Sequence, residues 1–371
     1  MDSTELLNIL ALLKTEGVGD IVAKKLINHC GSAEDVFKTK ANQLKAIDGI
    51  GDVLIKNLKD KSVFEKAEQE LRFIEKQEST ILYYQNDNYP DRLKHCIDGP
   101  VLLFASGNLN LKNRRIISIV GTREITSYGT NFCKKLIEDL AVFNPVIVSG
   151  FAYGVDIVAH QAAMDNNLQT IGVLAHGLNQ IYPKTHKKYV ANMEGNGGFI
   201  TEFWSNSNPE KENFVRRNRI VAGVSEATVV IESAEKGGSL ITAMIANDYN
   251  RDVFAVPGRT SDKYSQGCNN LIKTQRANLM TSAADLVYIL NWELPIASKS
   301  RNEKTVQKQL FVVLDTDEQK VYDYLQKNGK QVMDIIALEC EFPIFRISSL
   351  LLNMELKGVI RPLPGKLFEA V

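Results

Sequence analysis

One short stretch of the chain combines residue types that suit the binding of phosphate and base. Residues 213–219 hold three arginines, two asparagines and one phenylalanine, and an apolar helical pattern follows them directly. Guanidinium groups bind phosphate through paired hydrogen bonds, and a neighbouring aromatic ring can stack on a base. The stretch contains no side chain that suits a nucleophile or a general base. We therefore expect it to hold a ligand without transforming it.

The elements around this stretch form an alternating pattern. Short, largely β-branched apolar runs predict strands at 116–120, 146–148, 171–174, 228–231 and 253–256. Amphipathic segments between them predict helices near 128–142, 156–164, 187–193, 214–224 and 239–247. Continuous apolar runs are typical of strands that are buried on both faces. The pattern predicts an α/β fold with a Rossmann-like, doubly wound, mostly parallel sheet.

The predicted strands end in residues of one chemical character. Glycine, hydroxyl and arginine groups follow them, in Gly121-Thr122-Arg123, Ser149-Gly150, Ala175-His176-Gly177, Gly237-Gly238-Ser239 and Pro257-Gly258-Arg259. Ligands of doubly wound sheets bind at the carboxyl ends of the strands. Backbone N–H groups at helix starts form anion-binding concavities there. These loops therefore predict a phosphate-binding edge.

Charge supports nucleic-acid binding only locally. Lys plus Arg and Asp plus Glu both total 44, so the net charge is zero and the case rests on local patches. Basic residues cluster within 112–123, 184–188 and 211–219. Each cluster alone could be a solvated surface. With Tyr182, Trp204 and Phe214 nearby, a basic groove with stacking rings is the favoured interpretation.

The N-terminal region contains an internal duplication. The sequence of 17–26 returns at 49–58 with Gly, apolar, Gly, Asp, Lys and Leu in register. Each copy resembles a helix-hairpin-helix turn, which can hold a DNA phosphate on helix N–H groups. The alternative is a small helical domain whose hairpins only pack together, and Asp20 and Asp52 lie where a phosphate would approach. DNA contact here is expected to be accessory.

The C-terminal region predicts a separate module. Helical patterns near 318–326, 332–338 and 345–356 precede two short strands, 359–362 and 367–369, as in a winged helix. The third helix carries a single arginine, Arg346, and an apolar stripe that favours protein interaction over duplex binding. The expected domains are 1–78 (helical, helix-hairpin-helix-like), 79–296 (extended Rossmann-like), 297–310 (linker) and 311–371 (winged-helix-like).

Several other classes of protein are disfavoured. The five cysteines are scattered without a Cys-x-x-Cys pair, and no apolar run reaches about 18 residues, so a cytoplasmic protein with reduced thiols and no membrane span is expected. A P-loop and a Gly-x-Gly-x-x-Gly motif are both missing, and the histidines lack metal-ligand spacing, so neither cofactor nor metal is expected. His160 is predicted to be a packed core residue, whereas His176 could contact a ligand.

An enzyme remains as the alternative. The loop from Glu232 to Ser239 resembles the Pro-Gly-Gly-x-Gly-Thr loop of nucleoside-phosphate N-glycosidases, which share a related scaffold. Their catalytic Glu falls at Met244 here, and Leu240 and Ile241 replace Gly-Thr. The binding chemistry is therefore expected to persist without the hydrolytic step.

Motifs spread over about 200 residues resemble the DNA-processing protein DprA (Smf) family. They are Tyr89-Pro90-x-x-Leu93, Pro100, Phe104-Ala-Ser-Gly107, Ile119-Val-Gly-Thr-Arg123, Ser149-Gly-Phe-Ala-Tyr-Gly-Val-Asp156 with Ala159-His160, 172–174 through Tyr182-Pro183, 214–223, Gly237-Gly-Ser239 and Pro257-Gly258. The resemblance implies a non-enzymatic protein of competence and DNA recombination. It would protect incoming single-stranded DNA and load the recombinase RecA during natural transformation. It would also form a homodimer through the Rossmann-like domain.

The resemblance also implies which residues contact DNA. Carried over position by position, they are Gly121, Thr122, Arg123, Ser149, Gly150, Lys211, Phe214, Arg216, Arg217, Asn218, Gly237, Gly238 and Ser239. For Asn218 and Arg219, helix capping and packing is the alternative role.

Overall fold

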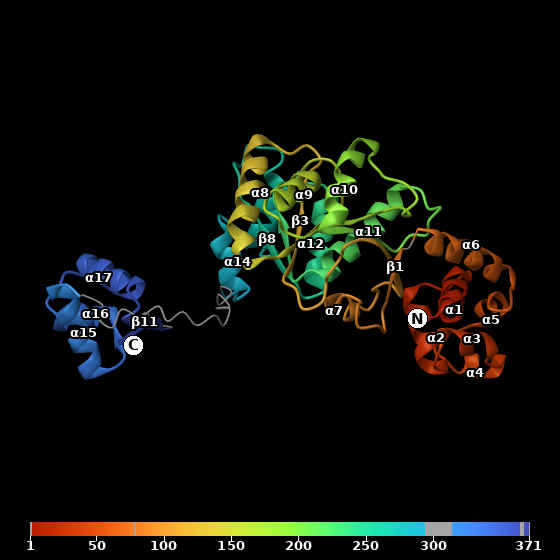
Figure 1. Cartoon of the computed structure of the whole chain (residues 1–371), viewed down its shortest axis with the longest axis horizontal. Coiled ribbons are helices and arrows are strands. Elements are labelled where there is room, and N and C mark those ends of the chain that lie inside the picture. The colour runs from red at the N-terminus through yellow and green to blue at the C-terminus, as the bar shows by residue number, and fades with distance from the viewer. Residues whose placement is uncertain (1, 78, 294–313, 364–366, 371) are drawn as a thin grey trace, which may run out of the picture. The chain divides into compact units, whose positions relative to one another are not determined.

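The computed structural model describes residues 2–77, 79–293, 314–363 and 367–370 (Figure 1). The chain divides into two compact units, Met1–Ile296 and Ala297–Val371. The predicted linker, 297–310, lies outside the described residues. No helix in the described ranges is both long and apolar enough to span a membrane.

The first unit begins with a helical region. Its helices are α1 (Ser3–Lys14), α2 (Asp20–Cys30), α3 (Ala33–Lys38), α4 (Ala41–Lys45), α5 (Asp52–Asn57) and α6 (Ser62–Lys76). The two duplicated glycine turns precede α2 and α5, where Gly17 and Gly49 have nearly the same positive φ, 86° and 84°. This backbone conformation favours glycine, which explains the repeated residue. Fully buried side chains such as Leu10 and Leu26 form the core of this region.

A nine-stranded sheet follows. Its strands are β1 (Thr80–Tyr83), β2 (Leu102–Gly107), β3 (Ile116–Val120), β4 (Val146–Ser149), β5 (Thr170–Val173), β6 (Gly197–Thr201), β7 (Ala227–Val230), β8 (Asp252–Ala255) and β9 (Asn278–Leu279). The order in the sheet is β1-β2-β6-β5-β4-β3-β7-β8-β9. In this order, the seven strands β6-β5-β4-β3-β7-β8-β9 are all parallel to their neighbours. At the other end of the sheet, β2 pairs antiparallel with β6, and β1 pairs antiparallel with β2. The five predicted strands and the mostly parallel sheet are confirmed; β1, β2, β6 and β9 were not predicted.

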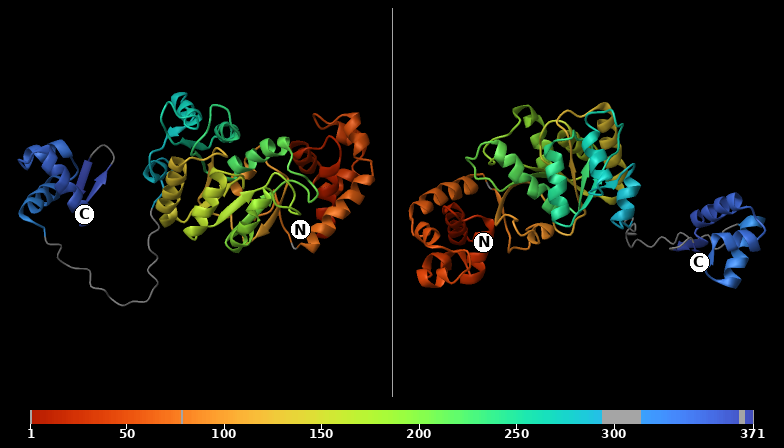
Figure 2. Two further views of the ribbon diagram at one scale, coloured as in Figure 1. Left: turned by 90° about the horizontal axis from the view of Figure 1, so that it is seen from above. Right: turned by 180° about the vertical axis from the view of Figure 1, so that it is seen from behind.

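Helices cover both faces of the sheet (Figure 2). One face carries α8 (Ser127–Leu140), α9 (Val155–Asp165) and α14 (Ala283–Ile289). The other carries α7 (Asp91–Lys94), α11 (Lys211–Val224), α12 (Gly238–Asp248) and α13 (Gln266–Lys273). The short helix α10 (Val190–Gly195) precedes β6.

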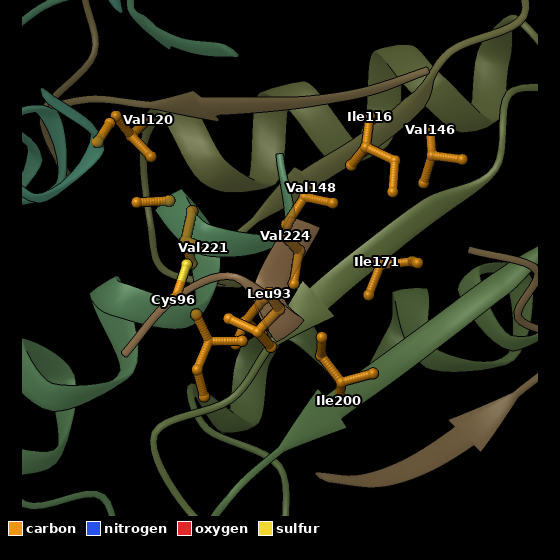
Figure 3. Packing of buried hydrophobic residues seen from close by; sticks show 14 of the residues in the cluster. Leu93, Cys96, Ile116, Val120, Val146, Val148, Ile171, Ile200, Val221 and Val224 are labelled. Carbon is orange, nitrogen blue, oxygen red and sulfur yellow. The ribbon is translucent and has the colours of Figure 1, made fainter. Parts of the chain in front are cut away.

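The core beneath α11 fixes the position of that helix. Val148 and Ile171 of the sheet pack in one cluster with Val221 and Val224 of α11 and with Leu93 (Figure 3). All five side chains are at most 1% exposed. Complete burial of such a side chain contributes about 1.5–3 kcal/mol. Residues 221 and 224 are therefore anchored, and the preceding turns of α11 are held at the sheet's edge.

The strand order creates a switch point beside β3. The chain proceeds from β3 through β4 and β5 to β6 in one direction, and then returns to place β7 on the other side of β3. The loops that follow β3 and β7 therefore diverge, and such crevices are where doubly wound sheets bind ligands.

The second unit has the winged-helix arrangement that the sequence predicts. It contains α15 (Thr316–Asn328), β10 (Gln331–Val332), α16 (Met333–Glu339), α17 (Ile344–Leu356), β11 (Ile360–Leu363) and β12 (Leu367–Ala370). The three strands form one antiparallel sheet in the order β10-β12-β11. Arg346, the only arginine of α17, forms an ion pair with Asp317 of α15.

Candidate nucleic-acid interface

A cavity of about 310 Å³ opens at the switch point. Loops after β3, β4 and β7 line it together with α11 and the start of α12. Ten of the predicted DNA-binding residues line this cavity, hereafter the groove: Gly121, Thr122, Arg123, Gly150, Phe214, Arg217, Asn218, Gly237, Gly238 and Ser239. Residues from four separate segments of the sequence thus meet as predicted, although contact with DNA stays a prediction.

One side of α11 faces the groove. Phe214, Arg217, Asn218 and Val221 all line it, and their spacing of three, four and seven positions places them on one helical face. The Asn218 amide also donates a hydrogen bond to the Gly238 carbonyl, at 3.3 Å, which ties α11 to the start of α12. Asn218 therefore has a packing role, which the sequence offered as the alternative, and it also lines the groove; its contact with DNA stays a prediction.

Arg217 is the most buried cation of the groove. Only 6% of the residue is exposed, and its Nη1 donates to the carbonyl of Val173, at the end of β5, at 2.6 Å. Its Nε has no hydrogen-bond partner among the described residues. Burial lowers the pKa of Arg217, and the nearby Asp156 carboxylate opposes that shift. A guanidinium group that is shielded from water and still has an N–H group without a hydrogen-bond partner is well suited to bind an anion.

Aromatic rings lie beside this cation. The Arg123 guanidinium lies 5.4 Å from the centre of the Phe214 ring, and the Tyr182 ring lies edge-on to Phe214 at 5.9 Å. Tyr182 is 43% exposed. An exposed ring next to arginines is the arrangement on which unstacked bases bind.

A smaller cavity of about 50 Å³ adjoins the groove, with Arg123, Phe214 and Arg217 lining both. His176 lines this smaller cavity, and its contact with a ligand stays a prediction. Its Nδ1 lies 2.9 Å from the Gly177 carbonyl, and burial lowers its pKa, which favours the neutral ring. His160, by contrast, is fully buried in α9 and contacts Thr170, as predicted for a core residue.

Three predicted residues lie outside the groove. The Ser149 hydroxyl is buried and donates to the Ile119 carbonyl at 2.5 Å. Lys211 is exposed at the first position of α11. Arg216 pairs with Glu202 at 2.6 Å and lies 3.7 Å from Asp20. Arg216 lies about 200° around α11 from Phe214 and about 100° from Arg217, so it lies on a different flank of the helix.

Trp204 also lies elsewhere than expected. Its ring packs with the core of the helical region, and the Lys14 ammonium lies 4.5 Å from the ring centre. Trp204 therefore does not belong to the ring set beside Phe214. The groove has Tyr182 and Phe214 instead.

The two duplicated turns have different surroundings. At the first, Asp20 accepts a hydrogen bond from the Val101 amide at 2.9 Å and pairs with Arg219 at 3.1 Å. The start of α2 is therefore directed at the sheet domain. At the second, Asp52 is exposed and pairs only with Lys45 among the described residues. Of the two turns, only the second is exposed in a way that would allow the predicted contact with DNA, and that contact stays a prediction.

Some lining residues were absent from the predicted set. Asp156, Lys236 and Thr242 line the groove. Lys236 directly precedes the glycine pair of its loop, and this adjacency could have indicated it. Asp156 stands in the Ser149–Asp156 motif, but its acidic side chain argued against phosphate. Its carboxylate accepts from the Ala152 amide at 3.1 Å and lies near Arg217, so it organises the loop.

Comparison with known proteins identifies the family of this chain. Residues 80–291 match the family model of DNA recombination-mediator protein A, and residues 312–366 match that of the DprA winged helix domain. Protein Smf of Escherichia coli is 33% identical over 305 residues, covering 80% of this chain and 79% of the relative.

Two solved structures are also similar. The DNA processing protein A structure from Streptococcus pneumoniae has a TM-score of 0.64 and 31% identity, covering 78% of this chain and 98% of that one. The Helicobacter pylori structure, which concerns a single-stranded DNA binding mode, has a TM-score of 0.52 and 28% identity, covering 57% and 95%. On these matches, the chain belongs to the DNA recombination-mediator protein A family, also called DprA or Smf.

Proposed function

We propose that this chain binds single-stranded DNA in the groove and acts as a recombination mediator without catalysis. The observation that carries the proposal is the meeting of Arg123, Phe214 and Arg217 around one cavity at the switch point. Two cations and a ring at one place provide for both the phosphate and the base of a nucleotide. The Helicobacter pylori relative, whose structure concerns single-stranded DNA binding, supports the assignment.

The mechanism is one of position and charge. The helix α12 has no side-chain cap at Gly237, so its first N–H groups are open to an anion. Phosphates would occupy this helix start and the guanidinium of Arg123, while bases stack on Phe214 and Tyr182. Backbone and stacking contacts read little sequence, so the binding would be largely independent of sequence.

The family to which the chain belongs supports a proposal about its wider role. We propose that the protein protects incoming single strands in the cytoplasm and loads RecA during natural transformation, and that it acts as a homodimer. A surface feature supports dimerisation through the Rossmann-like domain: β9 is an edge strand of the sheet, and its Leu279 is 50% exposed. Two joined protomers would bind a strand with greater avidity than one.

The rival N-glycosidase activity is less well supported. Met244, where the catalytic carboxylate would stand, is 47% exposed on α12. The carboxylate of the neighbouring loop, Glu232, is buried and accepts hydrogen bonds from the Thr126 amide and hydroxyl at 2.8 and 2.5 Å. Glu232 thereby holds the start of α8, which leaves it poorly placed for hydrolysis.

Fluorescence anisotropy with a labelled dT oligonucleotide tests the proposal. If about four phosphates are neutralised per protomer, the logarithm of affinity should fall with the logarithm of salt with a slope of roughly −3. Arg123→Ala should weaken binding, whereas the same change at Lys134, an exposed residue of α8, should not. Absence of binding at low salt would refute the proposal, and release of free base from nucleotides would favour the enzyme.

A further inference from the structure

A second basic cavity, of about 440 Å³, lies at the amino ends of the parallel strands, whereas the groove lies at their carboxyl ends. Four arginines line it: Arg92, Arg114, Arg115 and Arg251. Arg115 directly precedes β3 and Arg251 directly precedes β8, so the parallel strands bring both to the amino edge. Arg123 follows β3, and a strand of that length separates it from Arg115 by about 16 Å. The basic cluster that the sequence shows within 112–123 is therefore two separate sites.

Two of these arginines have evident structural partners. Arg92 forms an ion pair with Glu226, whose carboxylate also accepts a hydrogen bond from the Trp292 indole. The guanidinium of Arg115 lies 5.1 Å from the Trp292 ring centre and donates to the Glu293 carbonyl at 2.9 Å. These contacts hold the C-terminal end of the sheet domain against the amino edge, and they account for Arg92 and Arg115.

The other two arginines have no such explanation. Arg114 donates to the Asn144 carbonyl at 3.1 Å, and Arg251 donates to the Arg92 carbonyl at 2.8 Å. Neither lies within ion-pair distance of a carboxylate in the part of the chain that the structure describes. The Nε of Arg251 is buried there without a hydrogen-bond partner. Carbonyl groups accept hydrogen bonds from these arginines but do not neutralise their positive charge. The charges of two partly buried guanidinium groups are therefore not balanced by a carboxylate.

The size of the cavity and its low acidity suit an organic phosphate. The exposed Asp91 is the single acid among the described lining residues, and the apolar lining residues Leu111, Ile116 and Val224 are at most 7% exposed. The volume falls within the range of about 300–1,000 Å³ that is usual for small-molecule sites. Two guanidinium groups that line one cavity of this size are complementary to the phosphate of a nucleotide.

We propose that this cavity binds a nucleoside phosphate, with the phosphate on Arg114 and Arg251 and the nucleoside in the remaining volume of the cavity. The ligand is either a free nucleotide or one nucleotide of a strand, because both present the same phosphate and sugar. The site is separate from the groove and does not depend on the proposed function of the groove.

Isothermal titration calorimetry of the full-length chain with dTMP tests this site. The measurement uses an Arg123→Ala background, which weakens binding in the groove, and the arginine variants are compared with the lysine control in that same background. The double change Arg114→Gln and Arg251→Gln should weaken dTMP binding by about tenfold or more, since charge-assisted hydrogen bonds are lost. The matched control is Lys134→Gln with Lys135→Gln, which removes two charges from α8, and it should bind dTMP as the background does.

Further arms keep the test decisive. Arg114→Gln alone, at a half-buried side chain with a single bonded neighbour among the described residues, serves if the double variant unfolds. Thymidine without phosphate should bind at least tenfold more weakly than dTMP. Equal dTMP affinity in the arginine variants and the lysine control, equal binding of thymidine, or no dTMP binding in the background would each overturn the proposal.

Binding of a dT oligonucleotide to the chain with Arg123 intact distinguishes the two sources of the phosphate, a free nucleotide and a nucleotide within a strand. A less steep salt dependence in the double arginine variant than in the lysine control would identify a strand that reaches the cavity. An unchanged salt dependence, together with lost dTMP binding, would identify a free nucleotide.

Discussion

The carboxylate of Asp20, at the first glycine turn, lies 3.1 Å from the guanidinium of Arg219 in α11. Glu202 is buried beside them and pairs with both Arg219 and Arg216. The helix that presents Phe214 and Arg217 to the groove is thus held on another flank by the helical region. A motif that resembles a DNA-binding turn here positions the helix that lines the groove.

This relationship predicts that the two copies of the turn differ in their contribution to stability. Asp20→Ala should lower the free energy of unfolding by about 1–3 kcal/mol, because the Val101 amide and Arg219 both lose a partly buried partner. Asp52→Ala is the matched control, since this exposed residue pairs only with Lys45 among the described residues; it should stay within about 0.5 kcal/mol of wild type. Urea denaturation measures both changes, and equal losses of stability would contradict the role of Asp20 in holding α11.

Much of the sheet can be predicted because burial on both faces leaves a clear signal. The β-branched runs of β3, β4, β5, β7 and β8 were recognised on this basis. The strand β6 begins with Gly197-Gly198, which lack strand propensity, and β9 has two residues. The edge strands β1 and β2 pair antiparallel, and nothing in a local pattern shows such a pairing.

The site was predictable as a set of loops but not in its helical detail. Parallel topology brings strand-end residues together, so Gly121, Arg123 and Gly237 could be expected to meet. The division of 213–219 between the groove and the ion pairs with Asp20 and Glu202 depends on how α11 is rotated against its neighbours. A helix turns by about 100° for each residue, so adjacent arginines such as Arg216 and Arg217 have different surroundings, and the local sequence does not show which of them faces the groove. Asp20, the partner that occupies Arg219, is far away in the sequence.

Two glycines of the groove should respond oppositely to alanine. A Cβ at Gly150 would lie 2.1 Å from Nη1 of Arg217 and 2.5 Å from the Asp156 carboxylate. Since Arg217 is held by Val173, Gly150→Ala should cost about 1–3 kcal/mol of stability and displace the guanidinium from the groove. At Gly238 nothing lies within 4 Å, so Gly238→Ala should leave stability unchanged or raise it by about 0.4–1 kcal/mol. Thermal unfolding and oligonucleotide binding distinguish the two; similar stability of both variants would refute the close packing of Arg217 on Gly150.

Stacking and charge should separate in the binding of dT oligonucleotides. Phe214→Leu keeps an apolar side chain on α11 but removes the ring, so binding should weaken by about 1–3 kcal/mol with an unchanged salt slope. Arg123→Ala should instead make the slope shallower by about 0.7. Anisotropy titrations over a range of salt give both quantities. Tyr288→Leu, at an 85% exposed ring on α14, is the control and should change neither; a changed slope in Phe214→Leu would argue against a stacking role.

Acid should destabilise the fold through His160. Burial lowers its pKa from 6.5 to about 3, its Nδ1 lies 2.7 Å from the Thr170 hydroxyl, and its Nε2 has no partner in the described chain. The unfolded chain therefore takes up a proton below pH 6.5 that the folded chain refuses until about pH 3. Stability is unaffected by this group above that window and falls within it by up to about 1.4 kcal/mol for each pH unit.

Urea denaturation across this window, for wild type and His160→Gln, measures the contribution. Glutamine does not titrate and can still bond to Thr170, so the variant should lose less stability than wild type as the pH falls. His29→Gln, at an exposed position of α2, is the control and should keep the wild-type pH dependence. His186 is also buried, and its pKa is lowered by that burial, so part of the acid sensitivity should persist without His160. An identical pH dependence in wild type and His160→Gln would show that the buried imidazole is not the acid-sensitive group.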